Sequence, residues 1–355
     1  MTPSNSDHVR HALSWLLYAQ SRKRDGGIPK ALHLLFGWLP SYPETSGYLI
    51  CTLRAAEASH PDLPLGESAL RIAKWLLTLQ RDDGSFPDST LRRPLVFDTG
   101  QILLGLADMH EQTGEPRFLD AATRAGDFLT ACQSPDGSWV SHAFNDIPHA
   151  YYTRVAWGLM RLFDRTGDTV YRDRAQANVE WAIAQQRENG FLGHAGFTLK
   201  GHESPFTHTI TYALEGIART GLHLDNTDYL GAAVRGLAPL VAATPAAGRV
   251  PGTFDSAWRG DESFSCLTGC AQLSLVSQLL APKAPELPLR DFSARVNAYL
   301  RTKQRVGRGR RRVRGALAGS SPIWKDYHRL SYPNWAAKFL ADALLMEDGC
   351  PAPNG

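Results

Sequence analysis

Five threonines recur at nearly regular intervals along the chain, and the residues before them include groups that can transfer protons. The threonines are Thr45, Thr99, Thr153, Thr209 and Thr268, separated by 54, 54, 56 and 59 residues. The residue directly before each of the first four is Glu44, Asp98, Tyr152 and His208, respectively. Because equivalent positions of a repeat face the same way, we expect these four side chains to lie around one cavity as the catalytic residues.

The two carboxylates of this row fit the hydrolysis of glycosidic bonds. Such hydrolysis needs one carboxylic acid and one carboxylate, which Glu44 and Asp98 supply. If the two residues begin adjacent helices, the helix axes are roughly 8–10 Å apart. Carboxyl groups at that separation leave room for a water molecule, which favours an inverting mechanism.

The other two residues fit proton transfer at a sugar carbon, and the sequence leaves both mechanisms open. His208 and Tyr152 can abstract and return the C5 proton of a uronate, giving epimerisation or elimination. Arg154 or Arg259 then neutralises the substrate carboxylate. This mechanism predicts that His208→Ala lowers turnover at least about 100-fold, and that Arg154→Ala weakens binding most at low salt. The Arg, His and Tyr content favours this mechanism over hydrolysis.

Aromatic and polar residues near the same positions form a candidate binding surface for sugars. Pyranose rings stack on Trp and Tyr, while Arg, His and acidic side chains bind hydroxyl and carboxylate groups. Tyr151 is also an alternative to Tyr152 as the tyrosine that faces the cavity. The expected substrate contacts are Tyr42, His149, Tyr151, Arg154, His202, Glu203, Trp258, Arg259, Trp324, Tyr327, Tyr332 and Asn334.

Two kinds of helical segment must position these residues. The threonine-led segments, such as "DTGQILLGLA" and "LTGCAQLSLV", contain few charges and many small residues, which indicates buried, closely packed helices. The threonines fit the N-cap position of such helices. The intervening segments, such as "IAKWLLTLQRDDGSF" and "AGDFLTACQSPDGSW", are amphipathic and end in Gln and a glycine turn. Their fifth and sixth copies, around "AVRGLAPLVAATPAAG" and "FSARVNAYLRTKQRVGRG", look degenerate.

The repeat predicts the architecture. A sixth copy, "PNWAAKFLADALL", keeps the frame with Asn334 in place of the threonine, which gives six repeats of two helices. We therefore predict an all-α fold, an (α/α)6 toroid of six helical hairpins with inner helices ringed by outer ones. The toroid should span residues 1–355 as a single domain, with a basic loop at 301–320 and less than a tenth of the chain in strands.

At this level the chain resembles known families. The plan is similar to the α/α toroid of six-hairpin glycosidases, terpenoid cyclases and protein prenyltransferase β subunits, and "QRDDGSF" and "QSPDGSW" resemble the Gln-Trp repeat of triterpene cyclases. The stretches "YPETSGYL", "THTITYALEG", "SCLTGCAQL" and "YPNWAAKFLADAL" resemble toroid proteins found with bacterial exopolysaccharide biosynthesis genes. These motifs are mainly structural, so the resemblance implies the fold more than the reaction.

The chain departs from the isoprenoid members of this group. It has neither the D-x-D-D motif of type II cyclases nor the D-D-x-x-D motif of type I cyclases. "DESFSCLTGC" offers Asp261 and Cys266 but no D-x-C pair with a following His of the prenyltransferase zinc site. We therefore expect no metal and no cofactor, and an isoprenoid enzyme is the third candidate function.

Composition and charge narrow the remaining possibilities. The N-terminal "MTPSNSDHVR" shows no signal pattern and no apolar run is long enough to span a membrane, so we expect a cytoplasmic protein. The run "RTKQRVGRGRRRVR" (301–314) is basic, but no nucleic-acid module surrounds it, which favours an acidic glycan over nucleic acid as the partner. The leading hypothesis is a carbohydrate-active enzyme that modifies an acidic polysaccharide or oligosaccharide. The alternative is a non-catalytic toroid that binds glycan or is a scaffold in polysaccharide biosynthesis.

Overall fold

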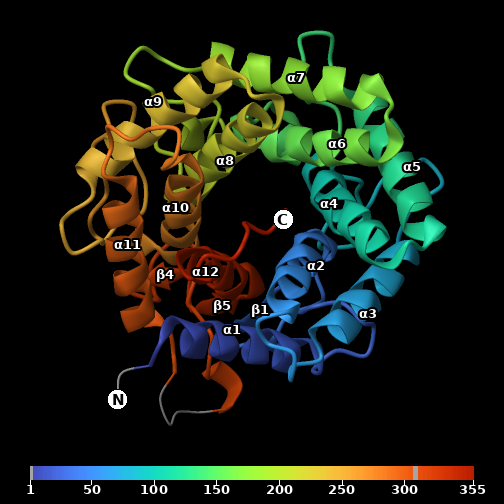
Figure 1. Cartoon of the computed structure of the whole chain (residues 1–355), viewed down its shortest axis with the longest axis horizontal. Coiled ribbons are helices and arrows are strands. Elements are labelled where there is room, and N and C mark those ends of the chain that lie inside the picture. The colour runs from blue at the N-terminus through green and yellow to red at the C-terminus, as the bar shows by residue number, and fades with distance from the viewer. Residues whose placement is uncertain (1–2, 307–310) are drawn as a thin grey trace.

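The structure is a computed structural model that describes residues 3–306 and 311–355. Its helices form two concentric rings around a central axis (Figure 1). The inner helices are α2 (Pro43–Glu57), α4 (Val96–Thr113), α6 (Thr153–Thr166), α8 (Thr207–Leu224), α10 (Leu267–Leu280) and α12 (Asn334–Glu347). The outer helices are α1 (Asn5–Gln20), α3 (Leu65–Leu77), α5 (Pro116–Cys132), α7 (Thr169–Ala184), α9 (Thr227–Ala243) and α11 (Leu289–Lys303). The predicted (α/α)6 toroid of six hairpins is confirmed.

Strands are short and lie in the loops that precede the inner helices. β1 (Ala31–His33) pairs with β2 (Gly37–Trp38) and with β5 (Ser331–Pro333), in the order β2-β1-β5. β3 (Ser265–Cys266) pairs with β4 (Ser320–Ser321). The β1–β5 pairing joins the loop before α2 to the loop before α12, so it holds the first and last repeats together.

Small residues let the inner helices pack closely. An ideal Cβ atom on Gly47 would lie 2.5 Å from the Cα of Ile102, and one on Gly105 would lie 2.1 Å from the carbonyl oxygen of Gly47. Both distances are far below a van der Waals contact, so any larger residue would push α2 and α4 apart. The small residues of the repeat therefore set the spacing of the helices that carry Glu44 and Asp98.

Glutamines at the ends of α1, α3, α5, α7 and α11 join each of these helices to the next outer helix, whereas α9 has Thr244 at its end and lacks this bond within the described residues. The Gln133 side-chain amide donates to the carbonyls of Gly137, in its own turn, and of Arg174 on α7. Gln80 and Gln186 make the same pair of bonds in their repeats. Gln304 donates to the carbonyls of Gly315 and of His8 on α1, which closes the outer ring. The sixth copy, although degenerate in sequence, therefore makes both bonds, whereas the fifth copy has Thr244 in place of the glutamine and makes neither.

The repeat threonines are not N-caps, which corrects the sequence-based prediction. The caps of α2, α4 and α6 are Tyr42, Leu95 and Tyr152, so each threonine lies inside the first turn. Their hydroxyls make lateral contacts instead. Thr99 Oγ1 accepts from the backbone N–H of Phe86, and Thr153 Oγ1 donates to the carbonyl of Ala213 on α8. In these two repeats the backbone group belongs to a neighbouring segment, whereas Thr209 Oγ1 donates to the carbonyl of Phe206 in its own turn and Thr268 Oγ1 has no hydrogen-bond partner within the described residues.

The predicted basic loop is only partly a loop. Its first residues, 301–303, belong to α11, and residues 315–320 are buried. Residues 307–310, within the predicted loop, lie outside the described residues. Arg311–Val313 form a short 3-10 helix on the surface.

The end of the ring opposite the long loops is filled by the segment that follows α12, whose end lies near the central axis in Figure 1. The carbonyl of Asn354 accepts from Trp157 Nε1 (2.9 Å), the carbonyl of Pro353 accepts from Arg219 (2.6 Å), and the carbonyl of Gly355 accepts from Lys338. Across the described ranges, no helix is both long and apolar enough to cross a bilayer.

Candidate active site

A cavity of about 500 Å³ opens at the end of the ring where the inner helices begin. The first turns of α2, α4, α8 and α12 and the long loops before the inner helices line it. Among the predicted catalytic residues, Glu44, Asp98 and His208 line this cavity, and Tyr152 does not. The repeat position therefore predicted three of the four placements.

Glu44 and Asp98 form a pair of buried carboxyl groups on adjacent inner helices. They lie in the first turns of α2 and α4, with 8% and 2% of their surface exposed. Burial raises the pKa of Glu44 to about 7. Burial also raises the pKa of Asp98 well above its ordinary value, and the charge of Glu44 raises it further. Near neutral pH, the pair therefore holds a proton that ordinary carboxyl groups would have lost.

One oxygen of this pair has no hydrogen-bond partner in the part of the chain that the structure describes, and a nearby lysine opposes the effect of burial on both carboxyl groups. Asp98 Oδ2 is buried and makes no hydrogen bond within the described residues. Lys30 also lines the cavity and lowers the pKa of both carboxyl groups by its charge, but burial prevails. A buried oxygen without a partner is costly unless something else donates to it.

The raised pKa of Glu44 predicts how stability depends on pH. Because this pKa is about 7 in the folded chain and 4.5 otherwise, the folded state binds the proton more tightly. The associated stability is complete below pH 4.5 and is lost as the pH rises to about 7. Glu44→Gln should make the decline of Tm across this window shallower. Glu203→Gln, at an exposed carboxylate, is the control and should leave the decline unchanged; an equal decline in both variants would contradict the prediction.

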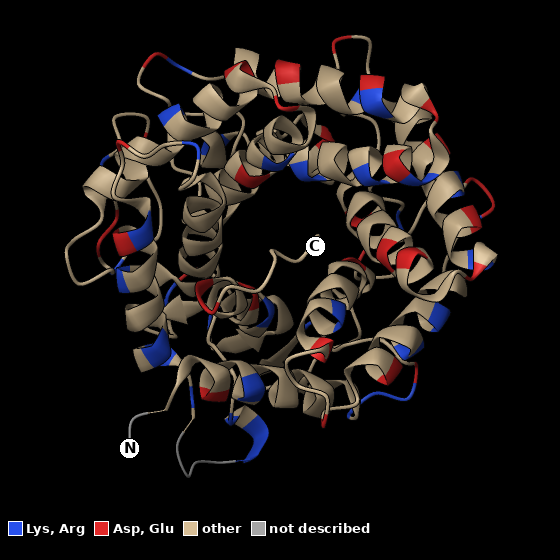
Figure 2. Ribbon diagram, in the orientation of Figure 1, with Lys and Arg blue, Asp and Glu red and all other residues tan. Residues whose placement is uncertain are grey.

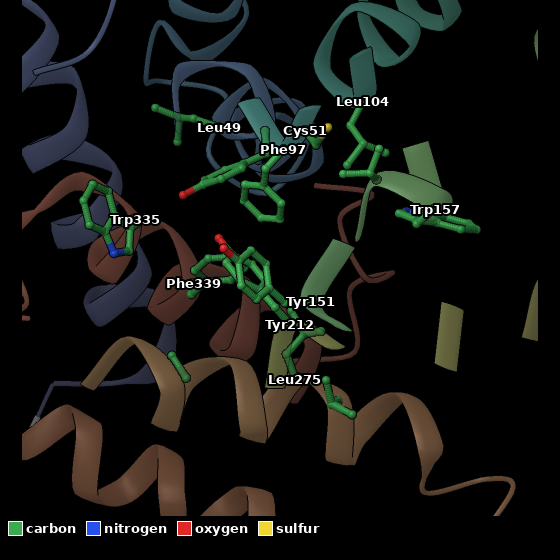
Figure 3. Packing of buried hydrophobic residues seen from close by; sticks show 14 of the residues in the cluster. Leu49, Cys51, Phe97, Leu104, Tyr151, Trp157, Tyr212, Leu275, Trp335 and Phe339 are labelled. Carbon is green, nitrogen blue, oxygen red and sulfur yellow. The ribbon is translucent and has the colours of Figure 1, made fainter. Parts of the chain in front are cut away.

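Aromatic rings form the walls of the cavity. Phe97 packs against Tyr151 and Tyr212, whose ring centroids lie 5.2 Å and 5.4 Å away, and Figure 3 shows the three side chains close together. Tyr42 meets Trp335 edge to face at 6.4 Å on another side. Flat aromatic faces beside charged groups such as Glu44, Asp98 and Arg93 suit sugar rings that carry hydroxyl and carboxylate groups.

His208 is held in one tautomer. Its Nδ1 donates to the side-chain oxygen of Gln272 at 2.6 Å, because that oxygen can only accept. Burial lowers the pKa of His208 to about 4, so the ring is neutral near pH 7 and Nε2 keeps a lone pair. His328 lines the same cavity, and burial lowers its pKa to about 3.

Tyr152 was wrongly placed in the cavity. Its hydroxyl accepts a hydrogen bond from the backbone N–H of Phe144 at 2.8 Å, which uses it to hold the loop. The 3-10 helix Ala150–Tyr152 precedes α6 directly and changes the direction of the residue before Thr153. Tyr151, the stated alternative, lines the cavity instead.

Arg154 was also misplaced as a ligand for a substrate carboxylate. It is fully buried, and its guanidinium donates to Glu215 at 2.6 Å and to Gln101 at 3.2 Å. Its guanidinium carbon lies 5.3 Å from the ring of Tyr212, which lines the cavity. Arg154 therefore belongs to a buried ion pair behind the cavity wall.

The remaining predicted contacts divide unevenly. Tyr42 and Tyr327 line the cavity with Tyr151. Most of the others have structural partners: Trp258 Nε1 donates to Asn189, and Asn334 donates to Pro29 and Thr45. The predicted contacts outside the cavity are His149, His202, Glu203, Trp258, Arg259, Trp324, Tyr332 and Asn334, in addition to Arg154.

Sequence reasoning missed several lining residues. Phe97 carried a usable signal, because it stands two residues before Thr99 as Tyr151 does before Thr153. Trp335 follows Asn334, and Lys30 follows the first glycine turn, but neither position recurs as the same residue type in other repeats. Asp88 and Arg93, from the loop before α4, complete the charged part of the lining.

Comparison with protein-family models and with curated proteins finds no match to the sequence. Solved structures do match over nearly the whole chain. The unsaturated glucuronyl hydrolase of Bacillus sp. GL1 has a TM-score of 0.76 at 16% identity, covering 99% of each chain. A mutant unsaturated glucuronyl hydrolase of Streptococcus agalactiae complexed with dGlcA-GalNAc6S has a TM-score of 0.68 at 13% identity, covering 96% of this chain and 90% of that one.

A cellobiose 2-epimerase of Bacillus thermoamylovorans also matches, with a TM-score of 0.75 at 11% identity, covering 96% of this chain and 99% of the epimerase. This chain shares the fold of these hydrolases and this epimerase. At such low identities the likeness concerns the fold, so the reaction has to be argued from the cavity.

Proposed function

We propose that this protein is a carbohydrate-active enzyme that acts on an acidic oligosaccharide or polysaccharide, with Glu44 and Asp98 as its general acid/base pair. The observation that carries the proposal is the pair itself: two buried carboxyl groups with raised pKa values in one aromatic cavity. In enzymes, the acid and base roles commonly belong to two titratable groups whose surroundings let one keep its proton at a pH at which the other has lost it.

Hydrolysis is the reaction that this pair supports best. One protonated carboxyl can donate to the leaving oxygen, while the other, ionised, activates water or stabilises the sugar cation. Repulsion between the two carboxylates favours a single shared proton, and Asp98 is the more deeply buried of the two, at 2% exposed against 8%, which favours its neutral form; we therefore assign Asp98 as the acid and Glu44 as the base. Hydrolysis thereby replaces the uronate chemistry toward which the sequence leaned, since Tyr152 and Arg154 do not line the cavity.

Lys30 supports an acidic substrate. Its ammonium lies 4.9 Å from the ring centroid of Tyr42, at the cavity wall, where it can pair with a sugar carboxylate. The names of the structural neighbours support the same class, since they include glucuronyl hydrolases and one complex with dGlcA-GalNAc6S. We also propose a role in exopolysaccharide biosynthesis, on the resemblance noted above, and a cytoplasmic location.

Epimerisation is the second candidate, favoured by one observation. His208 faces the cavity with Nδ1 bonded to Gln272, which leaves Nε2 with its lone pair. A neutral imidazole of this kind can accept a proton from a sugar carbon, and one structural neighbour is a cellobiose 2-epimerase. An isoprenoid enzyme is disfavoured, because the cavity holds Glu44, Asp98 and Lys30 beside its aromatic rings.

The experiment is incubation with saturated uronate oligosaccharides in deuterated water, followed by mass spectrometry and a reducing-end assay. Unsaturated ones are tested in the reducing-end assay alone, because a released 4,5-unsaturated uronate becomes a keto acid that takes up deuterium on carbon from the solvent. New reducing ends without deuterium on the sugar carbons would support hydrolysis. Deuterium at a sugar carbon, with a loss of at least about 100-fold in His208→Ala, would select epimerisation. Binding of the oligosaccharides without any product would support the non-catalytic alternative, a glycan-binding or scaffold protein.

A further inference from the structure

The turn between β1 and β2 presents three large apolar side chains to solvent. Leu34, Leu35 and Phe36 are 50%, 73% and 76% exposed, and we call them the apolar tip. Single exposed apolar residues are common on protein surfaces, but three consecutive ones on a protruding hairpin are not. The exposed apolar surface of the tip therefore indicates a binding site for a partner that covers it.

The backbone of the apolar tip is already satisfied internally. The N–H groups of Leu35 and Phe36 both donate to Nδ1 of His33, at 3.1 Å and 3.3 Å, and the N–H of Leu34 donates to the carbonyl of Leu330. The His33 ring also stacks on Phe36, with centroids 4.6 Å apart. Because its amide donors are paired, the tip can enter an apolar phase without leaving those donors unsatisfied.

Cations gather around the base of the apolar tip. We call Arg22, Lys23, Arg24, Arg311 and Arg312 the basic collar, and Figure 2 shows Lys and Arg concentrated at this edge beside α1. Nη2 of Arg312 lies 3.7 Å from the Cβ position at Gly37, the residue after the tip. None of the five forms an ion pair with any acidic group in the described ranges.

Aromatic packing brings the two parts of the collar together. The guanidinium carbons of Arg22 and Arg311 lie 5.9 Å and 5.4 Å from the ring of Tyr18. That ring meets Trp38, in β2, edge to face at 5.9 Å. Arg22 and Arg311, which are almost 300 positions apart in sequence, therefore lie near the same ring beside the β1–β2 hairpin. Like charges repel, so this arrangement favours an anionic partner that offsets the repulsion.

We propose that the apolar tip and the basic collar dock the protein onto an anionic phospholipid bilayer. Insertion of Leu34, Leu35 and Phe36 among the acyl chains buries apolar surface, and the collar meets the lipid phosphates and anionic headgroups. A soluble polyanion would satisfy the collar but would leave the tip in water. A bilayer satisfies both features together, so the observations favour it.

Docking in this way also positions the cavity. Lys30, which lines the cavity, precedes β1 directly, and Leu330, which bonds to the tip, lies two residues after the cavity residue His328. The loops that carry the tip are therefore the loops that form the cavity mouth. A bilayer bound at the tip lies beside that mouth, where a membrane-associated substrate would enter.

The test is flotation of the protein with two kinds of vesicle, phosphatidylcholine alone and an equal mixture of phosphatidylcholine and phosphatidylglycerol. The protein should float with the anionic vesicles at low salt and be released at high salt. Leu35→Ser/Phe36→Ser should weaken partitioning about tenfold or more, and Arg311→Gln/Arg312→Gln should weaken it by a similar factor. Circular dichroism checks that these surface variants fold.

Matched variants distinguish this surface from general stickiness. Val170→Ser removes an exposed apolar side chain at the start of α7, at the opposite end of the ring, and Arg172→Gln removes a cation there. Both should float like the unmodified protein. Failure to float with anionic vesicles at low salt would overturn the proposal. Unchanged flotation of the tip variant would show that the tip does not enter the bilayer and would overturn the proposal. Binding to immobilised dextran sulfate without flotation would assign the collar to a soluble polyanion and overturn it equally.

Discussion

Asp98→Asn and Glu44→Gln should each lower the turnover of an acidic oligosaccharide by about 100- to 10,000-fold, the range expected for loss of a general acid or base. Both substitutions keep the size of the side chain and remove the proton that the pair exchanges. Substrate binding should weaken far less, because proton transfer acts mainly in the transition state. The measurements are kcat from a reducing-end assay and Kd from calorimetry.

The control for this prediction is Glu203→Gln. Glu203 was predicted as a binding residue from sequence, but it is exposed and lies outside the cavity lining, so the variant should keep full activity. The two carboxyl variants should also fold at least as well as the unmodified chain, since each removes a buried group that resists ionisation. Activity within a fewfold of normal in Asp98→Asn would refute the assignment of the acid.

Glu215→Gln should lower the free energy of unfolding by about 3–5 kcal/mol, the usual cost of removing one partner from a buried ion pair. Glu215 is fully buried and accepts from Arg154 at 2.6 Å and from Arg219 at 2.8 Å. The amide would leave Arg154, which is also fully buried, without a counter-charge. Urea unfolding monitored by circular dichroism measures the change.

The comparison for this second prediction is an ion pair on the surface. Asp62 pairs with Arg10 at 2.6 Å with both side chains well exposed, so Asp62→Asn should leave unfolding almost unchanged. The sequence had suggested that Arg154 variants would lose substrate binding in a salt-dependent way. We now expect Arg154→Ala to lose stability instead, with little dependence on salt. A Glu215→Gln protein as stable as the unmodified one would show that the buried pair contributes no net stability.

The ring was predictable because the sequence repeats the physical requirements of each hairpin. Small residues recur where inner helices touch, as at Gly47 and Gly105, and glutamines recur where outer helices meet, as at Gln80 and Gln133. The placement of Glu44, Asp98 and His208 followed from the same regularity. These patterns are local, so they can be recognised directly when a sequence repeats them at a regular interval.

The wrong predictions concern features that do not recur from one repeat to the next. A single turn of 3-10 helix before α6 was enough to direct Tyr151 rather than Tyr152 into the cavity. Arg154 was misplaced because its partner, Glu215, is 61 residues away, and nothing near Arg154 in sequence reveals that pairing. The threonines were read as caps because composition identifies the first turn of a helix, but the identity of the group that a hydroxyl contacts depends on the neighbouring repeat.

The bond from Gln304 to His8 has a consequence for how the chain can be cut and rejoined. It gives the contact between α11 and α1 the same glutamine bond that Gln20, Gln80, Gln133 and Gln186 make between other outer helices. The end of α12 also lies against the start of α1, where the Asn5 amide donates to Glu347 and Asp348 at 3.0 Å each. A short linker between Asp348 and Asn5 would therefore resemble the other turns at that end, with the loss of residues 349–355 and of their bonds to Trp157, Arg219 and Lys338. A circular permutant opened at the exposed turn of Gly114 should close into the same ring, because the contacts between hairpins do not depend on which hairpin comes first in the chain.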